Sequence, residues 1–90
     1  MRELAGYRLT PHAEEQIIRR GLDLEVVRQV LISPEQNVQT SPGRSVLQSR
    51  FPIGPSGKLY LVRVVADVDR TPAEVVTVYA TGKIDKYWKE

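Results

Sequence analysis

The sequence predicts an α+β fold, in which an N-terminal helical hairpin, with room for a short strand before it, packs on an antiparallel sheet of three to four strands. Up to Pro34, apolar residues recur at every third or fourth position, as on one side of a helix. After Pro34 they recur at every second position, as in strands. Helices that come first and hairpin-linked strands that follow are typical of the α+β class.

Both helices begin at recognisable capping residues. Thr10 is a favourable N-cap and Pro11 is favoured at the first helical position, so the first helix is expected over residues 11–20. Asp23 caps a second helix over residues 24–32 in the same way. The connection of roughly three residues predicts that the two helices form a tight hairpin.

The second half of the chain predicts strands separated by turn-forming residues. We expect one domain over residues 1–90, because chains below about 100 residues rarely divide further. Its last segment, residues 82–90, is a short charged tail that contains two aromatic residues. The expected strands are residues 45–51, 58–66 and 74–80, with a further short one at 7–9.

The composition excludes several kinds of functional site. The chain contains no cysteine and one histidine, His12. Disulfides, thiolate metal sites, a cysteine nucleophile and a histidine-rich metal site are therefore excluded, and we expect neither a metal nor a cofactor. No apolar run approaches the roughly 20 residues that cross a bilayer, and the first residues do not resemble a signal peptide. We expect a cytoplasmic protein with no membrane partner.

Basic residues are concentrated in the middle of the chain. Residues 36–66 contain Arg44, Arg50, Lys58 and Arg63 and no acidic residue, whereas both flanking segments are slightly acidic. Such a segment either binds a polyanion or is an ordinary solvated part of a sheet.

Several short motifs resemble a prokaryotic family of small proteins of unknown function. Members open with Thr-x-His-Ala, continue to an Arg-Gly pair and add a second helix, and the resemblance covers about residues 7–80. Their last strand reads like residues 76–79 here. The matching residues of the helical half are Leu9-Thr10-Pro11-His12-Ala13, Arg19-Arg20-Gly21-Leu22, Val27, Val30-Leu31 and Pro34.

In the order of its elements, this family is similar to the RelE/BrnT-like toxins of toxin–antitoxin systems. Those toxins are small α+β ribonucleases that cleave mRNA without a metal and are held inactive by an antitoxin. The resemblance implies a RelE-like fold, RNA or ribosome-bound mRNA as a partner, and a cognate antitoxin. It is a likeness of fold, and it assigns no catalytic residue by itself.

His12 is the first candidate for catalysis, because imidazole is the side chain that most readily exchanges protons near neutral pH. Helical spacing places Gln16 and Arg19 on the same side as His12. Together they are expected to handle RNA phosphates, with His12 as a base or a phosphate ligand. In the alternative, His12 bonds a neighbouring carbonyl or carboxylate and Arg19 stabilises the helix end.

Arg50, Arg63 and Tyr79 form the second candidate group, because all three lie within expected strands. Arg63 interrupts an otherwise apolar strand, so its charge needs solvent or a partner. If Arg50 and Arg63 share the open face of the sheet, they would stabilise phosphate charge, and Tyr79 would orient a base or phosphate. The alternative is a surface ladder of cross-strand pairs.

Further basic side chains extend the expected RNA surface. The tail interleaves Tyr87 and Trp88 with lysines, a pattern found in proteins that bind single-stranded nucleic acid. In the alternative, these aromatic residues fasten the tail to the edge of the sheet. The additional phosphate-binding candidates are Arg44, Lys58, Lys83 and Lys86.

The leading functional hypothesis is a toxin-like protein that cleaves mRNA. The alternative is a non-catalytic module that binds nucleic acid or protein on the same fold. A third hypothesis is an interaction domain whose exposed strand accepts a partner strand or helix.

Overall fold

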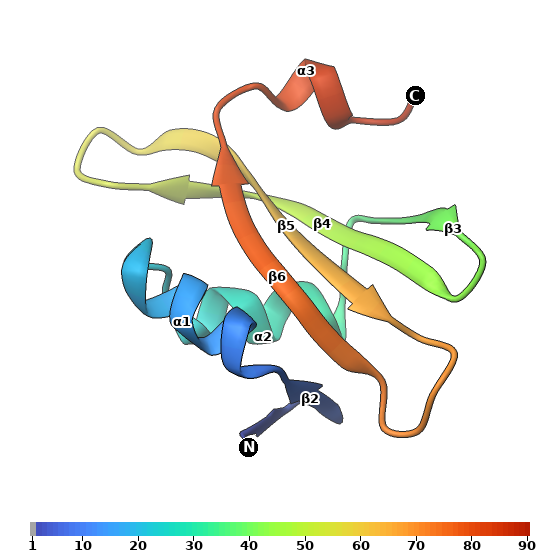
Figure 1. Cartoon of the computed structure of the whole chain (residues 1–90). Coiled ribbons are helices and arrows are strands. Elements are labelled where there is room, and N and C mark those ends of the chain that lie inside the picture. Colours follow the sequence, from blue (N-terminus) through green and yellow to red (C-terminus); the bar gives the residue numbers. More distant parts are fainter. Residues whose placement is uncertain (1) are drawn as a thin grey trace.

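The computed structural model describes residues 2–90, which form a single sheet and three helices (Figure 1). In chain order the elements are β1 (Glu3–Leu4), β2 (Tyr7–Leu9), α1 (Pro11–Arg19), α2 (Leu24–Ile32), β3 (Gln36–Ser41), β4 (Arg44–Ile53), β5 (Lys58–Asp67), β6 (Glu74–Thr81) and α3 (Ile84–Tyr87). The six strands lie in the order β1-β2-β6-β5-β4-β3. Helices α1 and α2 cover one side of the sheet, and α3 lies on the other side (Figure 1).

The predicted fold class, a helical hairpin on an antiparallel sheet of three to four strands, is wrong. The sheet has six strands instead of three to four, and it is mixed, because β2 runs parallel to β6. Strand β3 was missed because its sequence contains one apolar residue, Val38, and so shows no alternation. The parallel contact pairs Arg8 with Glu74 and Leu9 with Val75, and no local pattern can indicate a contact between residues so far apart.

The two longer helices form at the predicted positions for the predicted reason. The Thr10 hydroxyl accepts a hydrogen bond from the Ala13 N–H at 3.1 Å. The Asp23 carboxylate accepts one from the Glu25 N–H at 2.9 Å. Each cap satisfies an N–H group that has no partner within its helix. None of the helices in residues 2–90 is long and apolar enough to cross a membrane.

The side of the sheet that faces α1 and α2 carries the hydrophobic core. Along β5, Val62 and Val64 belong to this core, so Leu61 and Arg63 point to the opposite side. We call that opposite side the open face. The buried core residues are Leu9, Ala13, Ile17, Val27, Val30, Leu31, Leu47, Val62, Val64, Ala66, Val75 and Val78.

Candidate functional site

Arg63 lies at the centre of the open face, between two polar neighbours. Antiparallel pairing places it opposite Gln48 of β4 and opposite Tyr79 of β6. Its Nε donates a hydrogen bond to Gln48 Oε1 at 2.8 Å, and its Nη1 donates one to the Tyr79 hydroxyl at 2.5 Å. Gln48 is fully buried. Arg63 is therefore held in a fixed position, but its charge is not neutralised by a carboxylate.

The C-terminal tail lies across this group. The Tyr87 ring covers the Arg63 guanidinium, with 4.1 Å between Cζ and the ring centroid, and packs edge-on against the ring of Tyr79. The Gln48 side-chain amide donates a hydrogen bond to the Tyr87 carbonyl at 3.2 Å. The tail thus docks on the open face of the sheet. Tyr87, one of the two aromatic residues predicted to fasten the tail to the sheet edge, makes these contacts.

Arg50 also lies on the open face, two residues beyond Gln48 along β4. Its guanidinium binds the Glu35 carboxylate through two hydrogen bonds, of 2.9 and 3.2 Å. The Trp88 ring covers it, with 4.1 Å from Cζ to the centroid. The structure therefore brings Arg50, Arg63 and Tyr79 together on one face, an arrangement that the sequence left open. Aromatic rings of the tail cover both arginines.

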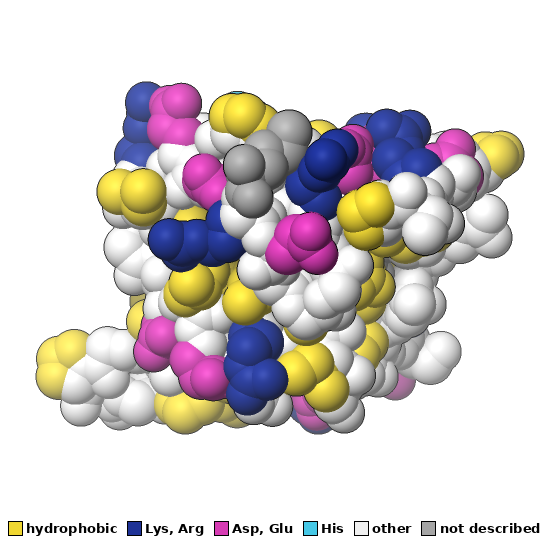
Figure 2. Space-filling model, turned by 90° about the horizontal axis from the view of Figure 1, so that it is seen from below, with side chains coloured by type: hydrophobic (Ala, Val, Ile, Leu, Met, Phe, Trp, Pro, Cys, Tyr) yellow, Lys and Arg dark blue, Asp and Glu magenta, His cyan; other side chains and the backbone are white. Residues whose placement is uncertain are grey.

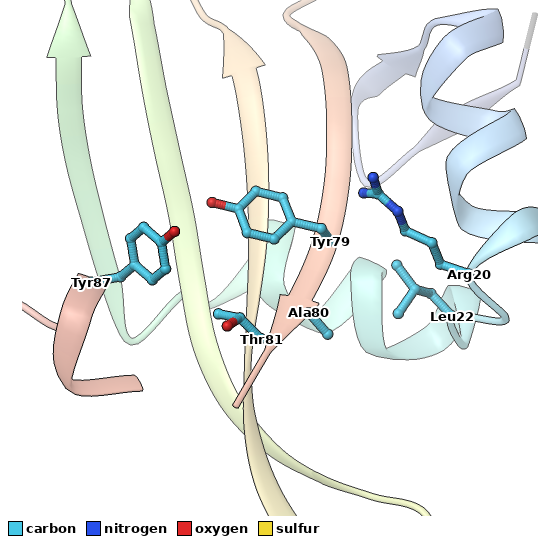
Figure 3. A pocket seen from close by; sticks show the side chains of 6 residues that line it. All are labelled: Arg20, Leu22, Tyr79, Ala80, Thr81 and Tyr87. Atoms are coloured by element: carbon cyan, nitrogen blue, oxygen red, sulfur yellow. The ribbon is translucent and has the colours of Figure 1, made fainter. Parts of the chain in front are cut away.

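A cavity of about 500 Å³ opens beside Tyr79 and Tyr87 (Figure 3). On the far side of β6, Arg20 reaches from the end of α1 and donates a hydrogen bond to the Val78 carbonyl at 2.7 Å. This contact depends on how α1 packs against β6, so the local sequence did not indicate it. The cavity is lined by Arg20, Leu22, Tyr79, Ala80, Thr81 and Tyr87.

The candidates on α1 lie away from this group. His12 is exposed, on the helix side of the sheet. Gln16 is buried beside the core residues Ala13 and Ile17 and does not form an exposed stripe with His12. Arg19 is exposed and pairs with Glu15 at 2.6 Å. These side chains are therefore separated by the sheet from Arg63 and Tyr79, and the two candidate groups do not combine into one site.

The remaining phosphate-binding candidates are one arginine that pairs with a carboxylate and three lysines that do not pair with one in the part of the chain that the structure describes. Arg44 is bound by Asp67 through hydrogen bonds of 2.7 and 3.2 Å at the far end of β4. Lys58 lies 5.4 Å from the centroid of the Tyr60 ring, and Lys86 lies 5.3 Å from that of Tyr87. Lys83 directly precedes α3 and its side chain makes no capping hydrogen bond. Within residues 2–90, no three histidine, cysteine or acidic side chains are grouped so that they could hold a metal.

Two carboxylates, those of Glu35 and Asp67, accept hydrogen bonds from arginines, and we therefore expect the stability of the fold to depend on pH. Hydrogen bonds from Arg50 lower the pKa of Glu35 below its ordinary 4.5, and the hydrogen bond from Arg44 lowers that of Asp67 below its ordinary 3.8. A lowered carboxyl pKa stabilises the folded state above the unfolded pKa, and this contribution is lost as the pH falls through the folded pKa. We expect the free energy of unfolding to decline below about pH 4.5.

Urea unfolding followed by circular dichroism at a series of pH values tests this expectation. The Glu35→Gln variant should be less stable than the wild type at neutral pH, and the difference should shrink as the pH falls. A difference that stays constant down to acidic pH would show that the Glu35–Arg50 pair does not contribute through its charge.

Comparison with known proteins gives one match. No curated protein and no solved structure matches the chain. Residues 9–80, which include every strand except β1 in whole or part, match a family described as a domain of unknown function, DUF4258. A likeness to RelE/BrnT-like toxins stays a prediction. Because the match covers most of the chain, the protein belongs to the DUF4258 family.

Proposed function

We propose that this protein binds single-stranded RNA at the end of the sheet that carries α3. The main support is the distribution of basic side chains that lack a carboxylate oxygen within 4.0 Å among residues 2–90. Such side chains gather on β5, on the tail and at the end of α1, and we call them the unpaired-cation surface. They are Arg20, Lys58, Arg63, Lys83, Lys86 and Lys89.

Most of the other basic side chains are paired, including Arg50 on the open face. On the side that carries the helices, basic and acidic side chains lie beside one another (Figure 2). Arg2, near β2, also lacks such a partner, but it stands alone there. An accumulation of cations without acidic partners is what phosphate binding requires. The paired residues are Arg8, Arg19, Arg28, Arg44, Arg50 and Arg70.

Aromatic side chains lie within this surface, next to a cavity. Tyr79 and Tyr87 line the 500 Å³ cavity together with Arg20. Proteins that bind single strands combine a cationic path for the backbone with aromatic rings on which bases stack. RNA is favoured over duplex DNA, because unstacked bases can enter a cavity of this kind.

Cleavage of the bound RNA is a second candidate function, favoured by the hydrogen bond between Arg63 and Tyr79. Arg63 would stabilise the charge that develops on the phosphate oxygens when the 2′-oxygen attacks phosphorus, and the Tyr79 hydroxyl would give its proton to the departing 5′-oxygen and take up the proton of the 2′-hydroxyl. The P–O5′ bond breaks, giving a 2′,3′-cyclic phosphate and a 5′-hydroxyl. With a cognate antitoxin, such a protein would be the toxin of a toxin–antitoxin pair. His12 lies on the helix side of the sheet and has no part in this reaction scheme.

Fluorescence anisotropy with labelled oligouridylate tests the proposal. We expect the logarithm of the affinity to fall with the logarithm of salt concentration, with a slope of about −2 to −3 if three or four phosphates are neutralised. Absence of binding at low salt would contradict the proposal. Gel analysis of the same mixtures separates the two functions, because cleavage would yield fragments from RNA and none from its 2′-deoxy counterpart.

A further inference from the structure

We propose that the tail, residues 82–90, masks a phosphate-binding pair formed by Arg50 and Arg63, and that RNA displaces the tail when it binds. This inference rests on the proposed RNA binding and adds how access to the site is controlled.

The two arginines form a compact cationic pair. Arg63 lies opposite Gln48, and Arg50 lies two residues further along β4, so the two are diagonal neighbours on the same face. Diagonal neighbours on adjacent strands are about 7–8 Å apart. Glu35 is the carboxylate that contacts Arg50, and Arg63 has none within 4.0 Å among residues 2–90. The pair therefore carries one uncompensated positive charge, that of Arg63, and a phosphate would have to compete with Glu35 for Arg50.

The tail covers both members of the pair in the same way. Tyr87 stacks on Arg63 and Trp88 stacks on Arg50, with 4.1 Å between guanidinium carbon and ring centroid in each case. An RNA base that stacked on either guanidinium would need the position that the tail ring holds. The tail and a bound RNA strand therefore compete for the same surface, and displacement of the tail would also move Tyr87 out of the cavity lining and leave Tyr79 and Arg20 to contact the RNA.

The contacts that fasten the tail are weak enough to exchange. None of the residues of α3 is buried, and no tail residue belongs to the hydrophobic core. Besides the two stacked rings, the tail is held by backbone hydrogen bonds to side chains. Gln36 accepts one from the Lys89 N–H at 3.0 Å and donates one to the Lys89 carbonyl, and Gln48 binds the Tyr87 carbonyl. Segments with few buried apolar contacts are the ones that open locally.

RNA can replace each contact that the tail gives up. Its bases offer ring faces to the guanidinium groups, and its phosphates offer the negative charge that the tail rings lack. Lys83 and Lys86 move with the tail and remain tethered through Gly82, so they stay available to the RNA backbone.

The only tryptophan in the chain, Trp88, reports on the state of the tail. We titrate the full-length protein with unlabelled oligouridylate and measure the quenching of Trp88 fluorescence by acrylamide. Displacement exposes the indole, so we expect its accessibility to acrylamide to rise as RNA saturates the protein. Bases that merely stacked on a docked tail would lower that accessibility.

A matched pair of variants separates the tail from the rest of the surface. Gln36→Ala removes the hydrogen bonds to the Lys89 backbone and the one that Gln48 donates to Gln36, while every charged and aromatic side chain of the surface stays in place. Gln39→Ala makes the same change in the same strand, at an exposed residue three positions on. We expect Gln36→Ala to bind oligouridylate about three- to tenfold more tightly than the wild type, because the tail is already undocked in a larger fraction of the variant molecules. Gln39→Ala should match the wild type.

The outcomes are distinguishable. Tighter binding by Gln36→Ala, with increased exposure of Trp88 on RNA binding, supports displacement. Weaker binding by Gln36→Ala, or protection of Trp88 by RNA, would make the docked tail part of the binding surface, which overturns this inference and leaves RNA binding in place. If the wild type and both variants all fail to bind, the proposed function itself is wrong.

Discussion

Replacing Arg63 by glutamine should weaken the binding of oligouridylate about tenfold to a hundredfold. Arg63 is the one arginine of the unpaired-cation surface that lies within the open face, and Gln48 and Tyr79 fix its position. A hydrogen bond to a charged group contributes about 1.5–3 kcal/mol, which corresponds to this range of affinity. Loss of one phosphate contact should also reduce the salt slope by about 0.7 for single-stranded RNA.

Arg28→Gln is the matched control for this change. Arg28 lies on α2, pairs with Glu25 at 2.7 Å, and belongs to the helix side of the molecule. Its replacement should leave RNA affinity unchanged, and circular dichroism should show that both variants are folded. If Arg63→Gln disturbs folding, Arg63→Lys serves instead, because it keeps the charge but loses the forked geometry. Equal affinities for the wild type, Arg63→Gln and Arg63→Lys would remove Arg63 from the site.

Replacing Leu9 by alanine should lower the free energy of unfolding by about 2–4 kcal/mol. Leu9 is fully buried and lies on β2, the strand that pairs in parallel with β6. Its side chain belongs to the cluster that also contains Ala13 and Val75, so the truncation leaves a cavity between β2, α1 and β6. Such a loss is a large part of the stability of a domain of this size.

Leu59→Ala provides the comparison, because the same truncation occurs at a side chain that is 50% exposed. We expect that variant to stay within about 0.5 kcal/mol of the wild type in urea unfolding. If the two variants lost equal stability, the three-residue β2 would not be a structural part of the sheet.

The features that could be predicted from the sequence are those encoded locally. Thr10-Pro11 and Asp23 place their helices correctly because a cap acts within a few residues of itself. Strand β3 and the parallel contact of Leu9 could not be predicted, since one depends on polar residues that pair with β4 and the other on a partner near the opposite end of the chain.

The candidate site likewise contains residues that the local sequence could indicate and residues whose positions depend on distant contacts. Arg63 was identified because a charge within an apolar strand needs a partner, and the structure supplies two polar ones. The positions of Arg20 and Gln48 depend on helix–sheet packing and strand register, which no spacing in the sequence specifies. Nothing in the spacing of Gln48 indicated that it would contact Arg63, Gln36 and the tail.

The contact between β2 and β6 also determines the order in which parts of the fold can form during synthesis. The early segment that contains Leu9 leaves the ribosome long before its partner Val75 exists, and closing so long a loop is slow. Helix α1 packs mainly against β6, so the apolar side of α1 also has no packing partner until β6 has been synthesised. Tyr79 lies on that same late strand. A nascent chain therefore lacks the proposed RNA-binding surface until β6 has been synthesised.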